Sequence, residues 1–291
     1  MKKILIIAFL SIFIINIKAQ DFHGVLVGIS EYPYPNELPD DCVWDAEDMS
    51  YKLGVYCGWQ TGNMEVLTDA YATEQDIKDA IAAMPRTSAN SDMFFFSGHG
   101  STSGLFTVDE NYLSPSELQN AFGSTYNYYS SFLDACRSGV FTTSMSKGVI
   151  SAACRSNESA YCGGPNGHSV FTAYLCLGLQ NNYKNAEDLH NYAAPLTTAY
   201  TPSMHPQLGD YFTGNFAFEY ELSGTLTYNQ AWVGSVSLQG NVTVPSGITL
   251  NIQSDATVNL SSYSITTSGG TLAVDSGATI NSSNSHTRLI T

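Results

Sequence analysis

The chain has 291 residues, 26 acidic and 11 basic side chains, and a formal net charge of −15 at pH 7. This length allows one or two domains, and an aromatic content of 12% is enough to build a folded core. Nucleic-acid binding depends on clustered Lys and Arg, so the acidic balance argues against a nucleic-acid partner and is compatible with attraction to cationic substrates.

The start of the chain has the pattern of a secretory signal peptide. Two lysines precede an apolar run at residues 4–15, and Ala19 offers a small residue for cleavage before Gln20. The alternative is a membrane anchor, but the run is shorter than the ~20 residues of a spanning helix. We therefore expect residues 1–19 to be removed. The remaining chain would be secreted or attached to the cell surface, without membrane insertion.

After the signal peptide, strand and helix patterns alternate. We expect strands at residues 23–30 and 63–68, and helices at 40–52 and 73–84 that have acidic residues in their first turns. Strand–helix alternation predicts a mostly parallel sheet covered by helices on both faces, an α/β fold.

Two continuous apolar runs then each end in small residues and one reactive side chain. Residues 92–99 end at His99, and residues 128–136 end at Cys136. Such runs are typical of strands buried in a parallel sheet, and sites form at the carboxyl ends of these strands. Imidazole is the usual activator of a cysteine nucleophile. The alternative is a loop histidine and a buried thiol, but the position of both residues at strand ends favours a catalytic pair.

The same domain continues with further alternation. We expect, in order, a hairpin at 105–112, a helix opening at a capping box from Ser114 to Glu117, a strand at 149–153, helices at 171–179 and 186–198, and a last strand at 215–220.

All six cysteines lie in the first two thirds of the chain. If Cys136 is a free nucleophile, one scheme pairs Cys42 with Cys57 and Cys154 with Cys162, and leaves Cys176 buried in an apolar helix. Connectivity cannot be fixed from sequence, so other pairings stay open. No C-x-x-C pair exists, which argues against a structural zinc site.

The segments that carry the two reactive residues resemble the caspase-like cysteine peptidases. Residues 97–100 (SGHG) and 134–139 (DACRSG) are similar to the histidine and cysteine motifs of that clan, and the Asp-x-Cys form is most similar to its metacaspase and paracaspase branch. Residues 23–30 and 149–153, with the helices that follow them, are similar to further blocks of the family. The resemblance covers about residues 22–220 and implies a caspase-like fold.

The resemblance implies a Cys–His dyad that hydrolyses peptide bonds in protein or peptide substrates. Cys136 would attack the carbonyl, His99 would transfer the proton, and the backbone N–H groups of Gly100 and Cys136 would bind the oxyanion. This chemistry requires no cofactor or metal. Many metacaspases bind calcium, so calcium stays open as a ligand, although the chain has no Asp-x-Asp-x-Asp-Gly loop.

Two acids are candidates for substrate binding. Asp134 precedes Cys136 by two residues and therefore points to the same side of its strand. In metacaspases the matching Asp lines the pocket for the residue before the cut, and a second acid precedes the first helix, where Asp40 lies nearest. Together they imply cleavage after Arg or Lys. Tyr161 stands where family members often have a further Asp. The alternative for both acids is helix capping or a solvated loop.

The composition changes at about residue 222, after which only three charged residues occur. Apolar residues alternate, and residues 242–250 match 272–280, which indicates a period of about 30 residues. We expect a parallel β-solenoid at 222–291, similar to repeats of bacterial surface proteins, following a peptidase domain at 20–221. The alternative is a small β-sandwich. Two coils are fewer than the ~3 repeats usually needed, so we expect the region to continue in a longer protein.

Three functions follow from these patterns. The first is an exported cysteine endopeptidase that cuts after Arg or Lys. The second is a surface-binding protein in which the solenoid binds and the caspase-like domain is inert. The third is a legumain-like peptidase or transpeptidase with a preference for Asn. The intact His99 and Cys136 favour the first over the second, and the acid at Asp134 argues against the third.

Overall fold

The computed structural model describes residues 22–33, 35–85, 91–123, 129–254, 256–282 and 289–290. The predicted signal peptide at 1–19 lies outside these ranges. Among the described residues, none of the helices combines the length and the apolar character needed to cross a membrane.

A six-stranded sheet forms the centre of the first domain, in the order β2-β1-β3-β7-β8-β9. All neighbours are parallel except the last pair, in which β9 runs antiparallel to β8. The bounds are β1 Phe22–Gly28, β2 Met64–Thr68, β3 Ser91–Ser97, β7 Tyr129–Asp134, β8 Val149–Ala152 and β9 Gln207–Asp210.

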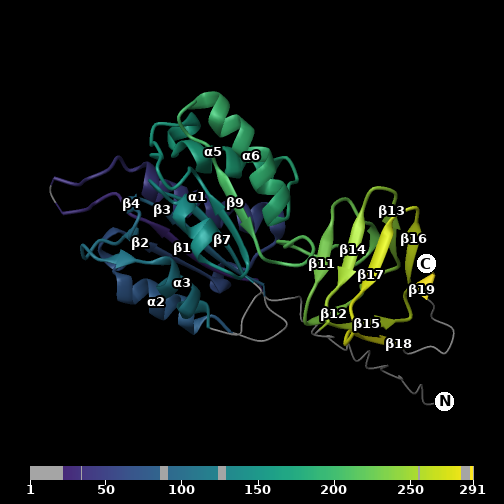
Figure 1. Ribbon diagram of the computed structural model, residues 1–291. Coiled ribbons are helices and arrows are strands. Elements are labelled where there is room, and N and C mark those ends of the chain that lie inside the picture. Colours follow the sequence, from purple (N-terminus) through teal and green to yellow (C-terminus); the bar gives the residue numbers. More distant parts are fainter. Residues whose placement is uncertain are drawn as a thin grey trace, which may run out of the picture.

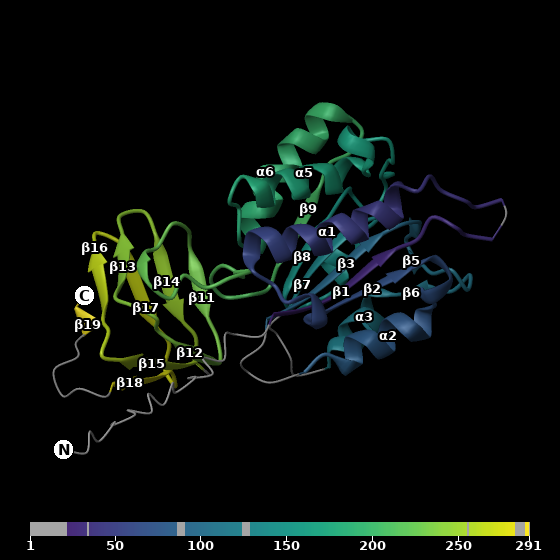
Figure 2. The same cartoon turned by 180° about the vertical axis from the view of Figure 1, so that it is seen from behind.

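Helices cover both faces of this sheet (Figures 1 and 2). One face is covered by α1 Asp41–Cys57, α5 Val170–Gln180 and α6 Ala186–Tyr200, and the other by α2 Glu74–Ala83, α3 Pro115–Phe122 and the short α4 Gly139–Ser144. Side chains of a strand alternate between faces, so Phe95 packs with the first group of helices and Phe94 with the second. The predicted α/β fold with both faces covered is confirmed.

Local signals account for several element ends. Helix α3 begins at the predicted capping box, in which Ser114 and Glu117 each bond the other's backbone N–H. Helix α1 ends at Gly58, which adopts a left-handed conformation that suits glycine. The predicted hairpin after His99 is a three-stranded antiparallel sheet of β4 Gly100–Ser101, β5 Gly104–Phe106 and β6 Tyr112–Leu113.

The predicted last strand at residues 215–220 is wrong. The final strand of the sheet is β9, and the later segment makes only an isolated bridge, between Ala217 and Asn185. Its alternating aromatic residues resemble a strand pattern, but they fill the core beside the start of α6. The N–H of Phe216 donates to the Glu187 carboxylate, and the N–H of Phe218 donates to the carbonyl of Lys184.

The C-terminal region is a three-sided stack of parallel strands, as expected for a solenoid (Figure 1). Apolar side chains such as Trp232, Leu250 and Val258 fill its interior. Its strands are β10 Gly224–Thr225, β11 Gln230–Trp232, β12 Ser235–Ser237, β13 Val242–Pro245, β14 Thr249–Ile252, β15 Thr257–Ser261, β16 Ile265–Ser268, β17 Thr271–Val274, β18 Thr279–Ser282 and β19 Leu289–Ile290.

The repeat length differs from the predicted one. Leu250 pairs with Leu272 and Val258 with Ile280, so one coil has about 22 residues. The matching segments 242–250 and 272–280 both contain a strand, a Ser-Gly corner and a strand. However, the first joins β13 to β14, and the second joins β17 to β18. The sequence match therefore aligns two different corners of the three-sided coil. It spans one full coil and one additional strand, so the period of about 30 residues is too long.

The solenoid contacts the end of the first domain at which β1 begins. Tyr220 packs against Phe22 and stacks on Trp232, and its hydroxyl donates to the carbonyl of Ala231 at 2.9 Å. The N–H of Val233 in turn donates to that hydroxyl at 3.0 Å. His99 and Cys136 follow the opposite, carboxyl ends of β3 and β7, so the solenoid lies away from them.

Candidate active site

Two neighbouring strands bring His99 and Cys136 to the same pocket. Strands β3 and β7 are parallel and in register at their last residues, where Ser97 lies opposite Asp134. His99 and Cys136 each follow two residues beyond these ends, and both line one cavity of about 390 Å³. The structure therefore places the two residues at the carboxyl edge of the sheet, where the sequence predicted them.

The imidazole of His99 is held from one side by the loop after β1. Its Nε2 lies 2.8 Å from the backbone carbonyl oxygen of Asn36, and its ring centroid lies 4.8 Å from that of Tyr32. A carbonyl only accepts, so Nε2 carries the proton in the neutral ring. Nδ1 is then the nitrogen that can accept a proton from a thiol. The Tyr32 hydroxyl also accepts from the N–H of His99 at 3.0 Å.

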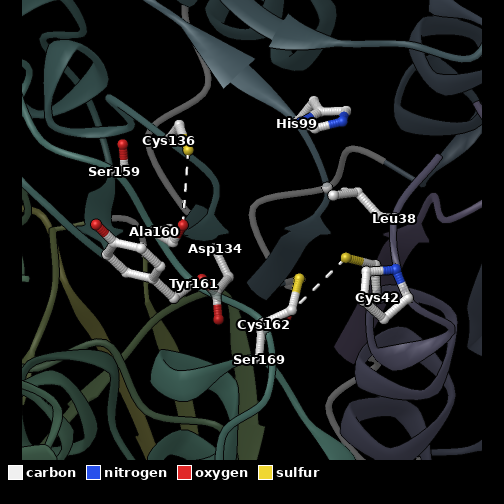
Figure 3. A pocket seen from close by; sticks show the side chains of 12 residues that line it. Leu38, Cys42, His99, Asp134, Cys136, Ser159, Ala160, Tyr161, Cys162 and Ser169 are labelled. Carbon is white, nitrogen blue, oxygen red and sulfur yellow. Dashed lines mark hydrogen bonds between the residues drawn. The ribbon is translucent and has the colours of Figure 1, made fainter. Parts of the chain in front are cut away.

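The thiol of Cys136 rests against the opposite wall of the pocket. Its Sγ lies 3.6 Å from the carbonyl oxygen of Ala160, and Figure 3 shows this contact and His99 across the pocket. Arg137, the next residue, has a φ of 61°, and its N–H donates to the Glu158 carbonyl at 2.9 Å. Cys136 therefore sits on a sharp turn. A rotation of its side chain away from Ala160 would bring the thiol toward the imidazole.

The two predicted oxyanion donors lie on adjoining backbone. Gly100 is paired with Leu105 in β5. The adjacent pair is His99 and Phe106, in which the Phe106 N–H donates to the His99 carbonyl. Bonded and non-bonded pairs alternate in an antiparallel ladder, so the Gly100 N–H points away from β5. A Cβ at Gly100 would lie 2.5 Å from the Cys136 carbonyl oxygen. Within the described ranges the Cys136 N–H has no hydrogen-bond acceptor.

Asp134 lines the pocket and is almost completely buried, with 3% of its surface exposed. One carboxylate oxygen accepts from the N–H and the hydroxyl of Thr172, at 2.9 and 2.8 Å, in the first turn of α5. Burial, and next the neighbouring Asp45 carboxylate, raise the pKa of Asp134 well above its usual value. An acid in this environment is stabilised in its charged form by a cation that enters the pocket.

The second acid near the pocket is Asp45 rather than Asp40. Asp40 is exposed and is not among the residues that line the cavity. Asp45 lies one turn further along α1 and is fully buried beneath the pocket wall. It accepts from the Ser97 hydroxyl at 2.6 Å and from the Ser169 N–H at 3.1 Å. Tyr161 lines the pocket and is about half exposed.

The predicted disulfide scheme is wrong. All six cysteines lie within the described ranges, and all are free thiols. Cys42 and Cys57 lie at opposite ends of α1, about 20 Å apart at 1.5 Å per residue, which no disulfide can span. Cys154 instead contacts the carbonyls of Ala135 and Glu158. The burial of Cys176 within α5 is confirmed.

Cys42 and Cys162 line the same pocket as Cys136. The hydroxyl of Ser169 lies 4.0 Å from the Cys42 thiol and 3.9 Å from the Cys162 thiol (Figure 3). Three thiols thus face one cavity. Of these three, only Cys136 follows the end of a central strand, and the neighbouring strand β3 is followed by His99.

Four residues that contribute to the site were not predicted as site residues from the sequence. The Asn36 carbonyl is a backbone group in a proline-rich loop and leaves no residue-type signal. Asp45 reads as an ordinary helix residue. His168 and Ser169 belong to the segment after β8, whose course depends on tertiary contacts. Among the described residues, no cluster of three or more His, Cys, Asp or Glu side chains could hold a metal ion.

Comparisons with known proteins agree with this geometry. The model of the caspase domain matches residues 23–199. No curated protein matches the chain.

Caspase-1 from Spodoptera frugiperda is similar in fold, with a TM-score of 0.54 and 14% identity over 70% of this chain and 92% of that one. A protein from Geobacter sulfurreducens aligns with a TM-score of 0.48 and 14% identity over 65% of this chain and 92% of its own. The family model spans more than half of the sequence and includes both strand ends, so the chain belongs to the caspase-domain family.

Proposed function

We propose that this protein is a cysteine endopeptidase in which Cys136 is the nucleophile and His99 the general base. The observation that carries the proposal is their meeting in one cavity, with His99 Nε2 bonded to Asn36. That bond leaves Nδ1 for the thiol, which is the arrangement that a base for a cysteine nucleophile needs.

The reaction would proceed in two steps. The Cys136 thiol transfers its proton to His99 Nδ1, and the sulfur forms a bond to the peptide carbonyl carbon. The oxyanion is bound by the N–H groups of Gly100 and Cys136, each worth ~3 kcal/mol. The imidazolium then protonates the leaving amine as the C–N bond breaks. Water, deprotonated by His99, hydrolyses the thioester and releases the carboxylate product.

Asp134 supports a preference for Arg or Lys before the cut. Its buried carboxylate has Thr172 as a hydrogen-bond donor, and within the described ranges no Lys or Arg lies among the residues of the pocket. A buried charge without a cation is costly, so a substrate cation that supplies the missing charge gains binding energy. An Arg side chain with two parallel hydrogen bonds would gain more than Lys.

We also propose that the protein is exported and acts on protein or peptide substrates outside the cell. The pattern of residues 1–19 supports this proposal. The solenoid contacts the peptidase domain on the side away from the pocket, an arrangement that leaves room for surface attachment through the C-terminal region. Calcium stays a candidate ligand.

The proposal is tested with fluorogenic peptides that carry Arg, Lys, Asn or Asp before the cut. The folded wild-type protein should cleave the Arg and Lys peptides, and Cys136→Ala should cleave none. Preference for Asn would support a legumain-like enzyme instead. A folded protein that cleaves none of the four would support the surface-binding alternative.

A further inference from the structure

A partly buried histidine lies between two carboxylates of α1, next to the pocket-lining Ser169. His168 Nδ1 lies 3.0 Å from Asp45 and its Nε2 lies 3.3 Å from Asp48. Only 12% of the histidine side chain is exposed. Both ring nitrogens therefore face acids, and only the imidazolium can donate to both at once. The two carboxylates raise the pKa of His168 to about 9, so the ring is charged at neutral pH.

Asp45 connects this histidine to the pocket. The same carboxylate accepts from Ser97, the last residue of β3, and from the N–H of Ser169, which lines the cavity. Ser169 also opens α5, whose first turn holds Asp134 through Thr172. Asp45 also acts on Asp134 through its charge: after burial, the Asp45 carboxylate is the largest contribution that raises the pKa of Asp134.

The negative charge of Asp45 is offset by the positive charge of His168. Asp45 and Asp134 are both buried acids, and the imidazolium of His168 offsets the first of them. Asp48, at the outer side of the histidine, is also paired with Lys52 at 3.7 Å. Asp134, in contrast to Asp45, accepts hydrogen bonds only from Thr172, so its carboxylate lines the pocket without a cationic partner among the described residues.

We propose that His168 is a specificity-determining positioning residue, whose charge neutralises Asp45 and so sets the pocket to accept one positive charge. This inference rests on the proposed peptidase function and goes further by naming the residue that fixes the strength of the basic preference. His168 acts through Asp45 and does not touch the substrate.

The test compares kcat/KM for two matched peptides, one with Arg and one with citrulline, its neutral isostere, before the cut. His168→Gln removes the positive charge and should raise the Arg-to-citrulline ratio by about 3- to 10-fold, because Asp45 becomes an uncompensated acid. Asp45→Asn removes the negative charge and should lower the ratio by a similar factor. The double variant should return the ratio close to that of the wild type.

His205→Gln is the control for a purely structural effect. His205 bonds Glu158 at 2.7 Å and so anchors the same segment after β8, but it is not among the groups that shift the pKa of Asp134. Its substitution should change both kcat/KM values by the same factor. If His168→Gln does not fold, the expected decrease of the Arg-to-citrulline ratio in Asp45→Asn still tests the proposal.

The outcomes separate the two claims. An unchanged ratio in both His168→Gln and Asp45→Asn, with an active wild type, overturns this inference alone. A folded wild type that cleaves neither peptide overturns the proposed function and this inference with it.

Discussion

The Nε2 of His99 lies 2.8 Å from the carbonyl oxygen of Asn36, so a backbone group holds the imidazole that we propose as the general base. The loop that carries this carbonyl is fastened by Asp69, whose Oδ1 accepts from the N–H groups of Ser30 and Glu31 at 2.8 Å each. The orientation of the imidazole therefore depends on a carboxylate that does not touch it.

Asp69→Ala should lower kcat by about 10-fold or more with a smaller change in KM, because a misplaced base slows proton transfer. Asn36→Ala is the matched control: it keeps the backbone carbonyl and should retain near-normal turnover. Steady-state kinetics on an Arg peptide measure both variants. Normal kcat in Asp69→Ala would show that the loop holds its position without that carboxylate.

Gly100→Ala should abolish most activity. Its Cβ would lie 2.5 Å from the Cys136 carbonyl oxygen and 2.9 Å from the Ala135 Cβ, so the backbone of the oxyanion site must move. Loss of one oxyanion donor costs about 10²–10³ in kcat. Gly62→Ala is the control, because a Cβ there meets nothing within 4 Å. Retained kcat in Gly100→Ala would remove Gly100 from the oxyanion site.

Asp134→Asn should lower kcat/KM for Arg peptides by about 10- to 150-fold, the equivalent of ~1.5–3 kcal/mol for a hydrogen bond to a charged group. The Asn oxygen can still accept from Thr172, so the change removes the charge and keeps the local bonds. A matched Asn peptide should lose much less. Equal losses on the two peptides would mean that Asp134 supports the strand end and does not read the substrate.

Stability should fall as the pH rises through the range in which His168 loses its proton. Its pKa in the folded protein, about 9, lies above the ordinary value of 6.5, so protonation favours the fold. The contribution is complete below pH 6.5, declines between 6.5 and 9, and is absent above 9. By linkage it is worth about 3 kcal/mol.

Urea unfolding at pH 6 and pH 9.5 measures this change. His168→Gln should reduce the difference in unfolding free energy between the two pH values, and His205→Gln should leave it nearly unchanged. An identical pH dependence in the wild type and His168→Gln would contradict the assignment of the buried imidazolium.

The elements of the first domain that could be predicted from the sequence are those whose structure is determined by neighbouring residues. The apolar runs before His99 and Cys136 specified central strands, and the capping box at Ser114 specified where α3 begins. The prediction of a strand at 215–220 was wrong because Phe216 and Phe218 alternate as in a strand but bond Glu187 in α6 and Lys184 just before it. Whether the backbone of this segment bonds a sheet edge or the start of a helix depends on tertiary structure, which the periodicity of the sequence does not reveal.

The site was predictable only in part for a similar reason. His99, Cys136 and Asp134 lie at or beside strand ends, so strand prediction sufficed to bring them together. The placement of Asp45 depends on which face α1 turns toward Ser97, whereas the choice of Asp40 rested only on its position before the first helix. His168 reaches Asp45 from 123 positions further along the chain, a contact that only folding reveals.

The most direct test of the account uses a peptidyl-arginine chloromethyl ketone, which alkylates an active thiol irreversibly as chloride leaves, followed by peptide mass spectrometry. The pocket contains Cys42, Cys136 and Cys162, so the position of the adduct distinguishes the nucleophile from its neighbours. We predict a single adduct on Cys136, with turnover lost in proportion to labelling and no adduct in Cys136→Ala. An adduct on Cys42 or Cys162, or turnover that persists in Cys136→Ala, would contradict the assignment of Cys136 as the nucleophile.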